Sequence, residues 1–467
     1  MKEKTFFRMV LIAGAATMLA ACTSESENGP SANISYENIV AAQQVPVTFG
    51  TYMGEQATTR YGVPGVIADD GTANTAEKLL ADKGGFGVFA YYTDNTNYSV
   101  SAKPNFMYNQ QVTGTPSGGG YPQTVSWSYA PIKYWPNEYG ASAASTGTDR
   151  LSFFAYAPYT TVDPNDGTPT GAEGVGTSGI TALTHNDISG DPKVSYKVAT
   201  NPAESVDLMY GVSAAAITDG PFGTGGSAIA AGDPLIDITK QAVSGKVNFD
   251  FKHALSRLNF TIQGAFDDDT TPTAADVDAN TKITVKSVVI NGANFYSNGV
   301  LDLNGGTWDI SGATTTSTNM TITTYLNPDI VDLGADDTHV QADSDGSDAL
   351  DDSLFGANNT VTGVTKAEKT LTTNATDYYM IIPVSTTISG VTITYFVNTK
   401  DTNLNAGYSR VKNVITKTFG TPISVAAGKA YKFKLNVGMT TVKIDASVSP
   451  WDTTAGTEEV WLPINTD

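Results

Sequence analysis

Short segments in which apolar and polar residues alternate recur along most of this 467-residue chain. In VPVTFG, residues 45–50, the alternation places Val45, Val47 and Phe49 on one side, and AYKFKLNVG, residues 430–438, repeats the pattern. Successive side chains of a strand point to opposite faces, so this period predicts strands with one buried face. Gly, Pro, Asn and Asp separate the segments and favour turns. The chain is therefore predicted to be all-β and built as sandwiches.

The chain is too long for one ordinary core, which predicts two domains. We expect the boundary near residue 240, with an N-terminal domain over residues 45–240 and a C-terminal domain over 241–467. A second alternation begins at Lys246 and is interrupted by HALSR, residues 253–257. A bulge or a single helical turn at this interruption would re-aim the strand.

The first residues of the chain are typical of an export signal. Lys2, Lys4 and Arg8 precede an apolar run, residues 9–21, that is too short to span a bilayer as a helix. The run ends in Leu-Ala-Ala-Cys, which looks like a bacterial lipobox. We therefore expect cleavage between Ala21 and Cys22, and acylation of Cys22 with chains such as palmitate. Residues 1–21 would then be a lipoprotein signal peptide, and residues 22–44 a flexible tether.

Cys22 is the only cysteine, so an internal disulfide and the usual cysteine-based zinc sites are excluded. The formal net charge is −20, which disfavours binding to nucleic acid or anionic lipid. No second apolar run is long enough to span a membrane, so contact with the membrane is expected through the lipid alone.

Nothing in the sequence predicts an enzyme or a cofactor. His185 and His339 lie in polar loops, and His253 is expected to be a hydrogen-bonded structural residue. No nucleophile elbow or phosphate-binding loop is present. Asp343, Asp345 and Asp352 have a spacing like that of a calcium loop, without evident flanking helices. They are a weak calcium candidate, and a solvated acidic loop is the alternative.

Six blocks, in their order along the chain, resemble the Bacteroidetes-type fimbrillin family, the type V pilins. They are VPVTFGTYMGEQATTR, GGFGVFAYY, PIKYWPN, LSFFAYAPY, DLMYG and VNFDFKHALSRLNFTI. SVSPW and VWLPI near the C-terminus resemble the end of the same pattern. The resemblance therefore covers nearly all of the chain beyond the tether.

The resemblance implies two transthyretin-like Greek-key β-sandwich domains in tandem, export as a lipoprotein and display on the outer membrane. It implies a structural or adhesive subunit of a surface fimbria that mediates cell adhesion. An arginine-specific protease would remove the first strand, and a C-terminal strand of another subunit would fill the groove. The partners would be other fimbrial subunits, identical or different, and an unidentified receptor on a host or bacterial surface.

Arg60 is the first basic residue after the lipobox, so cleavage between Arg60 and Tyr61 would release residues 45–60. An ordinary loop arginine is the alternative interpretation. Val460, Leu462 and Ile464 share one face of the last segment and form the candidate donor strand. That segment could also be a closing strand of its own domain, and residues 442–451 are the next candidate donor. The alternative function is a monomeric surface lipoprotein that binds a glycan or a host protein.

Overall fold

The computed structural model describes residues 45–52, 80–94, 96–117, 124–136, 149–170, 178–218, 228–240, 242–265, 280–313, 315–316, 318–322, 325–331, 354–355, 359–374, 377–404, 407–439, 441–451 and 460–461. Strands dominate this part of the chain, with a helical segment at residues 80–82 and the 3-10 helix η1 (Pro202–Glu204). The predicted all-β class is confirmed. Within these residues, no helix has the length and apolar character needed to cross a membrane.

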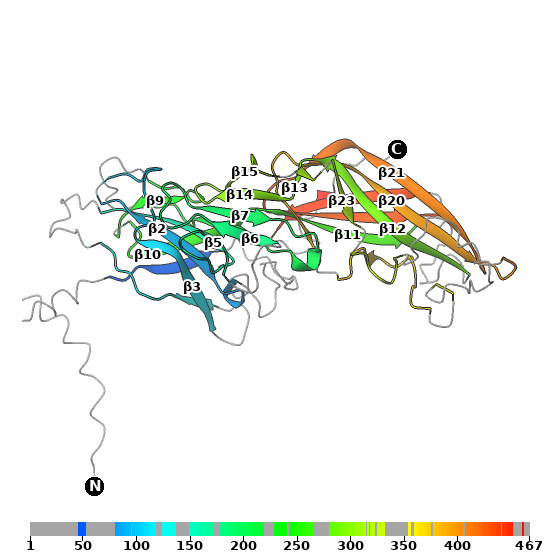
Figure 1. Cartoon of the computed structure of the whole chain (residues 1–467), viewed down its shortest axis with the longest axis horizontal. Helices are drawn as coiled ribbons and strands as arrows, with labels where there is room; N and C mark the ends of the chain where they lie inside the picture. Colours follow the sequence, from blue (N-terminus) through cyan, green and yellow to red (C-terminus); the bar gives the residue numbers. More distant parts are fainter. Residues whose placement is uncertain are drawn as a thin grey trace, which may run out of the picture. The chain divides into compact units, whose positions relative to one another are not determined.

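The largest sheet contains eight strands in the order β1-β10-β8-β5-β2-β3-β4, with β9 paired to β5. Figure 1 shows it formed mainly by the blue-to-green part of the chain. The first strand is parallel to its neighbour β10, whereas the other pairs are antiparallel. The bounds are β1 (Thr48–Tyr52), β2 (Phe86–Tyr92), β3 (Met107–Ser117), β4 (Thr124–Ser128), β5 (Leu151–Ala157), β8 (Met209–Ser213), β9 (Leu235–Ile238) and β10 (Lys246–His253).

A four-stranded sheet in the order β15-β14-β7-β6 packs against one face of the large sheet. Phe154 and Tyr156 of β5 share a buried cluster with Tyr196 of β7 and Leu301 of β14. The other face of the large sheet carries a second apolar cluster around Phe49, discussed below. The bounds are β6 (Gly179–Leu183), β7 (Lys193–Lys197), β14 (Asn298–Asp302) and β15 (Thr307–Asp309).

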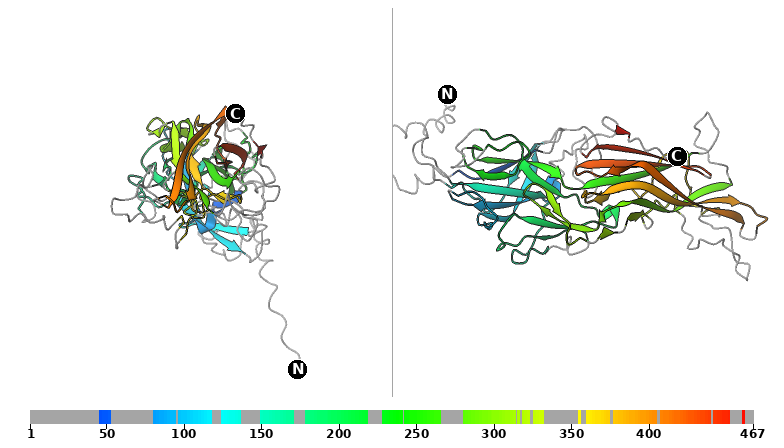
Figure 2. Two further views of the ribbon diagram at one scale, coloured as in Figure 1. Left: turned by 90° about the vertical axis from the view of Figure 1, so that its right-hand side faces the viewer. Right: turned by 90° about the horizontal axis from the view of Figure 1, so that it is seen from above.

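A second sandwich, formed by the green-to-red part of the chain, has two layers (Figures 1 and 2). One layer has the order β18-β11-β22-β23-β24 with β19 on β11, and the other has the order β17-β12-β20-β21. Phe260 and Phe433 stack at 5.3 Å in the core between them. A small sheet joins β13 and β16. The bounds are β11 (Ser256–Gly264), β12 (Thr281–Ala293), β13 (Phe295–Tyr296), β16 (Thr315–Thr316), β17 (Asn319–Ile322), β18 (Lys369–Thr370), β19 (Tyr379–Ile381), β20 (Thr387–Lys400), β21 (Tyr408–Ser424), β22 (Lys429–Val437), β23 (Val442–Pro450) and β24 (Val460–Trp461).

The chain changes from one sheet to another at Ala254 and Leu255, between β10 and β11. β10 pairs with β8 in the large sheet, and β11 begins two residues later in the six-stranded sheet. The interruption at HALSR is thus a change of sheet, in place of the expected bulge or helical turn. The hairpin of β14 and β15, well beyond residue 240, also pairs with β7 of the first sandwich. The boundary near 240, the Greek-key order and the transthyretin-like topology stay predictions.

Candidate functional site

The strand β1 lies at the end of the large sheet and has the features of a separable element. It pairs in parallel with β10 over five residues, from Thr48 opposite Lys246 to Tyr52 opposite Asp250. On its other side, residues 127–135 contact it at several points. The Val47 N–H donates to the Lys133 carbonyl at 2.9 Å, and the Trp135 N–H donates to the Val45 carbonyl at 2.9 Å.

Two inward side chains, those of Val47 just before β1 and Phe49 within it, pack this segment against the sheet. Val47 is 1% exposed and Phe49 is 5% exposed, as the alternation predicted. Val45 remains 36% exposed, so the structure places two of the three expected side chains inside. Burial of one large apolar side chain contributes about 1.5–3 kcal/mol. Val47 and Phe49 therefore supply most of the apolar stabilisation of β1.

Phe49 is the centre of an aromatic cluster. Its ring stacks on Phe249 of β10 at 6.0 Å and 19°, and Tyr129 tilts against it at 5.4 Å. The rings of Phe86 and Phe153 meet it edge-on at 6.2 and 6.1 Å. Edge-to-face and offset pairs at these distances stabilise beyond their buried area. The four rings therefore surround the Phe49 side chain and form an apolar binding site for one side chain of an extended segment.

Polar side chains next to the aromatic cluster bond the strand along its length. The Tyr129 hydroxyl donates to the Val47 carbonyl at 2.9 Å, and Trp127 Nε1 donates to Thr51 Oγ1 at 2.9 Å. Burial raises the pKa of Tyr129, so its hydroxyl stays protonated and remains a donor. One of these hydrogen bonds is made to a backbone carbonyl and the other to a small hydroxyl. Another extended segment could accept them if it placed its apolar side chains at the same positions.

Most other residues predicted for processing and assembly lie outside the described residues. These are Ala21, Cys22, Arg60, Tyr61, Leu462, Ile464 and the calcium candidates Asp343, Asp345 and Asp352. Among the described residues, no group of three or more His, Cys, Asp or Glu could hold a metal ion.

The C-terminal donor candidate is described only at Val460 and Trp461. These two residues form β24, which pairs with Val448 and Ser447 at the end of the six-stranded sheet. Its neighbour β23 is a different case. It pairs with β22 over nine residues and buries Val442, Ile444 and Ala446 in the core. The candidate donor over residues 442–451 stays a prediction, and its release would remove a central strand from the second sandwich.

The change of sheet at HALSR contains an interaction that the sequence pattern did not predict. His253 is 6% exposed, and its Nδ1 lies 2.9 Å from Asp207 Oδ2. Its ring stacks on Trp451 at 4.5 Å, and Arg257 Nη2 donates to the Trp451 carbonyl at 2.9 Å. The structural role expected for His253 is confirmed. Asp207 and Trp451 lie far from it in sequence, so the sequence carried no signal of their contact.

The comparisons with known proteins give one curated relative and several structures. No protein-family model matches the chain. A fimbrium subunit of Phocaeicola vulgatus is 27% identical over 193 residues, which cover 40% of this chain and 38% of that protein. The matched part is thus well under half of the relative's length. The similarity confirms the resemblance to fimbrillins.

Two solved structures are similar over most of the chain. A fimbrial protein from Bacteroides vulgatus matches with a TM-score of 0.51 and 19% identity, over 87% of this chain and 99% of that one. A candidate cell adhesion protein from Bacteroides uniformis matches with a TM-score of 0.36 and 13% identity, over 88% and 98%. The first of these supports the fold.

Proposed function

We propose that this chain is a structural or adhesive subunit of a surface fimbria, assembled by proteolytic removal of β1 and donor-strand exchange. The observation that carries the proposal is β1 itself. It is a five-residue parallel strand at the end of a sheet, held by two buried side chains and an aromatic cluster. Its loss would expose the backbone groups of β10 and the groove around Phe249, which an extended strand can fill.

Arginine burial supports Arg60 as the processing site. The chain has five arginines, and Arg8 lies in the predicted signal peptide. Arg150, Arg257 and Arg410 are only 1, 2 and 7% exposed, so a protease cannot reach them in the folded chain. Arg60 is the remaining arginine for a protease with this specificity. Cleavage there would separate β1 from the rest of the chain.

The incoming strand is proposed to come from the C-terminal segment of another subunit. Val460, Leu462 and Ile464 recur every second residue, the period with which Val47 and Phe49 enter the groove. Among the described residues, β24 pairs with β23 through two residue pairs, Val460 with Val448 and Trp461 with Ser447. The precursor would be delivered to the outer membrane on the lipid of Cys22, and its polymer would mediate adhesion.

N-terminal sequencing of the protein recovered from the cell surface tests the cleavage step. A start at Tyr61 is expected for a matured subunit, and a start at Cys22 for a retained anchor. Arg60→Ala should leave a folded, lipidated monomer that gives no ladder of polymers on an unboiled gel. Arg60→Lys is the matched variant. It keeps the positive charge at this position and removes only the arginine that the protease would recognise.

A normal ladder from the Arg60→Ala protein alone would contradict the cleavage mechanism. If the protein also stays monomeric after cleavage at Arg60, the alternative function applies, a monomeric surface lipoprotein that binds a glycan or a host protein.

A further inference from the structure

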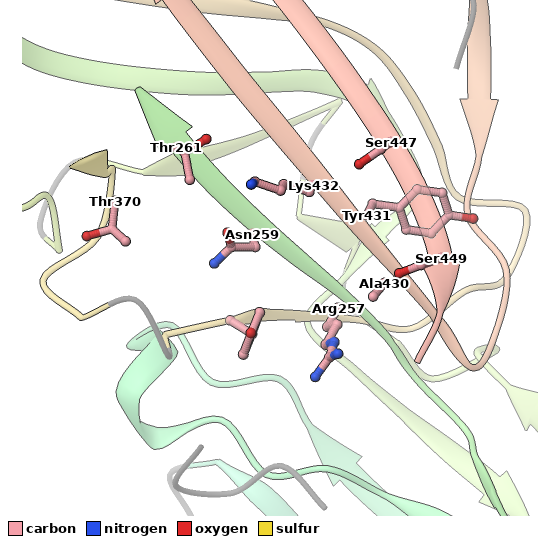
Figure 3. Close-up of a pocket in the computed structure, with 10 residues that line it drawn as sticks. Arg257, Asn259, Thr261, Thr370, Ala430, Tyr431, Lys432, Ser447 and Ser449 are labelled. Atoms are coloured by element: carbon pink, nitrogen blue, oxygen red, sulfur yellow. The ribbon is translucent and has the colours of Figure 1, made fainter. Parts of the chain in front are cut away.

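A recess on the outward face of the six-stranded sheet is separate from the groove of β1. Its volume is about 220 Å³, which accommodates a single monosaccharide. Strands β11, β22 and β23 supply most of its lining, and Thr370 and Tyr378 complete it. Figure 3 shows Arg257, Asn259, Lys432 and Thr370 arranged around it.

The register of the three strands explains why a hollow forms here. Two rungs cross the sheet side by side, and each ends in a small side chain on β23. The rungs are Arg257–Ala430–Ser449 and Asn259–Lys432–Ser447. Ala430 and both serines are short, whereas Arg257 and Lys432 are long, so the long side chains border a depression. Ser447 is 1% exposed and Ser449 is 7% exposed, which places them at the bottom of a recess rather than on a flat face.

The lining is rich in hydrogen-bond donors and positive charge. Arg257 and Lys432 are cations, Asn259 has an amide, and hydroxyls come from Thr261, Thr370, Ser447 and Ser449. None of the ten described lining residues is acidic, in a chain whose formal net charge is −20. Hydroxyls and amides recognise sugar hydroxyls, and cations recognise a carboxylate.

One carboxylate, that of Glu368, lies beside the recess and forms an ion pair with a cation of its lining. Glu368 lies 3.1 Å from Lys432 Nζ and 3.0 Å from Lys434 Nζ. Burial would raise the pKa of Glu368, but hydrogen bonds from Lys434, Thr261 and Lys432 lower it to about 2. The carboxylate is therefore charged at neutral pH and competes with any anionic ligand for Lys432.

We propose that this recess binds an acidic monosaccharide, with its carboxylate on Lys432 and its hydroxyls on Asn259 and Thr370. The proposal does not depend on strand exchange, since the recess lies on the second sandwich and its readout is sugar binding.

Saturation-transfer difference NMR on the full chain tests this site, with D-glucuronate and D-glucose as a matched pair that differs in the carboxylate. Glucuronate should bind and glucose should bind at least tenfold more weakly. Lys432→Ala should weaken glucuronate binding at least tenfold. Lys443→Ala is the control, because it removes an exposed cation from the same face of β23, opposite Asn436 and away from the recess.

Glu368→Gln gives a test in the opposite direction. It removes the competing carboxylate without emptying the recess, so glucuronate binding should become several-fold tighter. A variant that failed to fold would lose glucuronate binding, so tighter binding could not be caused by misfolding. Equal binding of glucose, equal binding of acetate, or glucuronate binding that ignores both Lys432→Ala and Glu368→Gln would overturn the proposal.

Discussion

The ring of Phe49 stacks on the ring of Phe249 at a centroid distance of 6.0 Å, joining two adjacent parallel strands that lie about 200 residues apart in the sequence. Phe249 belongs to β10, the strand that leads directly into the change of sheet at Ala254. The first strand is thus packed against the segment that connects the two sandwiches.

Phe49→Ala should weaken the attachment of β1. Truncation of a buried phenylalanine typically costs about 3–5 kcal/mol, because it removes apolar burial and leaves a cavity. We expect lower stability in urea and faster hydrogen exchange across Thr48–Tyr52. Val45→Ala, on the same face but 36% exposed, should cost less than about 1 kcal/mol. Equal effects of the two variants would show that the aromatic cluster does not hold the strand.

Cys22→Ser should abolish lipid attachment. It removes the only thiol in the chain, and no other apolar run could anchor the protein. Metabolic labelling with a fatty acid should fail, and the protein should appear in the medium or periplasm. Continued labelling of the Cys22→Ser protein would disprove the lipid assignment.

Deletion of residues 458–467 should produce a subunit that can accept a strand but cannot donate one. Of the residues that the structure describes, the deletion removes the two of β24 at the end of the sheet, and the second sandwich should still fold. Added to the intact protein, the truncated subunit should shorten the ladder of polymers on an unboiled gel. Deletion of residues 465–467 alone keeps all three apolar residues of the candidate donor and should leave the ladder normal. A normal ladder from the 458–467 deletion alone would exclude a C-terminal donor.

His253→Ala should destabilise the junction of the two sandwiches. It removes the partner that lies 2.9 Å from the carboxylate of Asp207, a residue with no exposed surface, and the ring that stacks on Trp451. Loss of a partner that leaves a buried polar group without its hydrogen bond typically costs about 1–3 kcal/mol.

Asn248→Ala is the matched control, because Asn248 lies in the same strand and is exposed. Its loss should cost less than about 1 kcal/mol in thermal or urea unfolding. A His253→Ala protein as stable as the Asn248→Ala protein would mean that the contact of His253 with Asp207 and Trp451 does not hold the junction.

The sequence by itself determined the period-two strands, the face that Val47 and Phe49 present, and the position of Cys22 after an apolar run. These properties are local, because the direction of a side chain along a strand depends only on its neighbours in the chain. The order of the family-like blocks could also be read without a structure.

The tertiary structure decided which strands lie side by side. The parallel pairing of β1 with β10, the change of sheet at Ala254, the burial of Arg150, Arg257 and Arg410, and the alignment of Lys432 with Asn259 and Ser447 all depend on backbone hydrogen bonds between distant segments. Alternation fixes a face but leaves the partner and the register of a strand open. For this reason the change of sheet at Ala254 and the recess around Lys432 could not be predicted from the sequence.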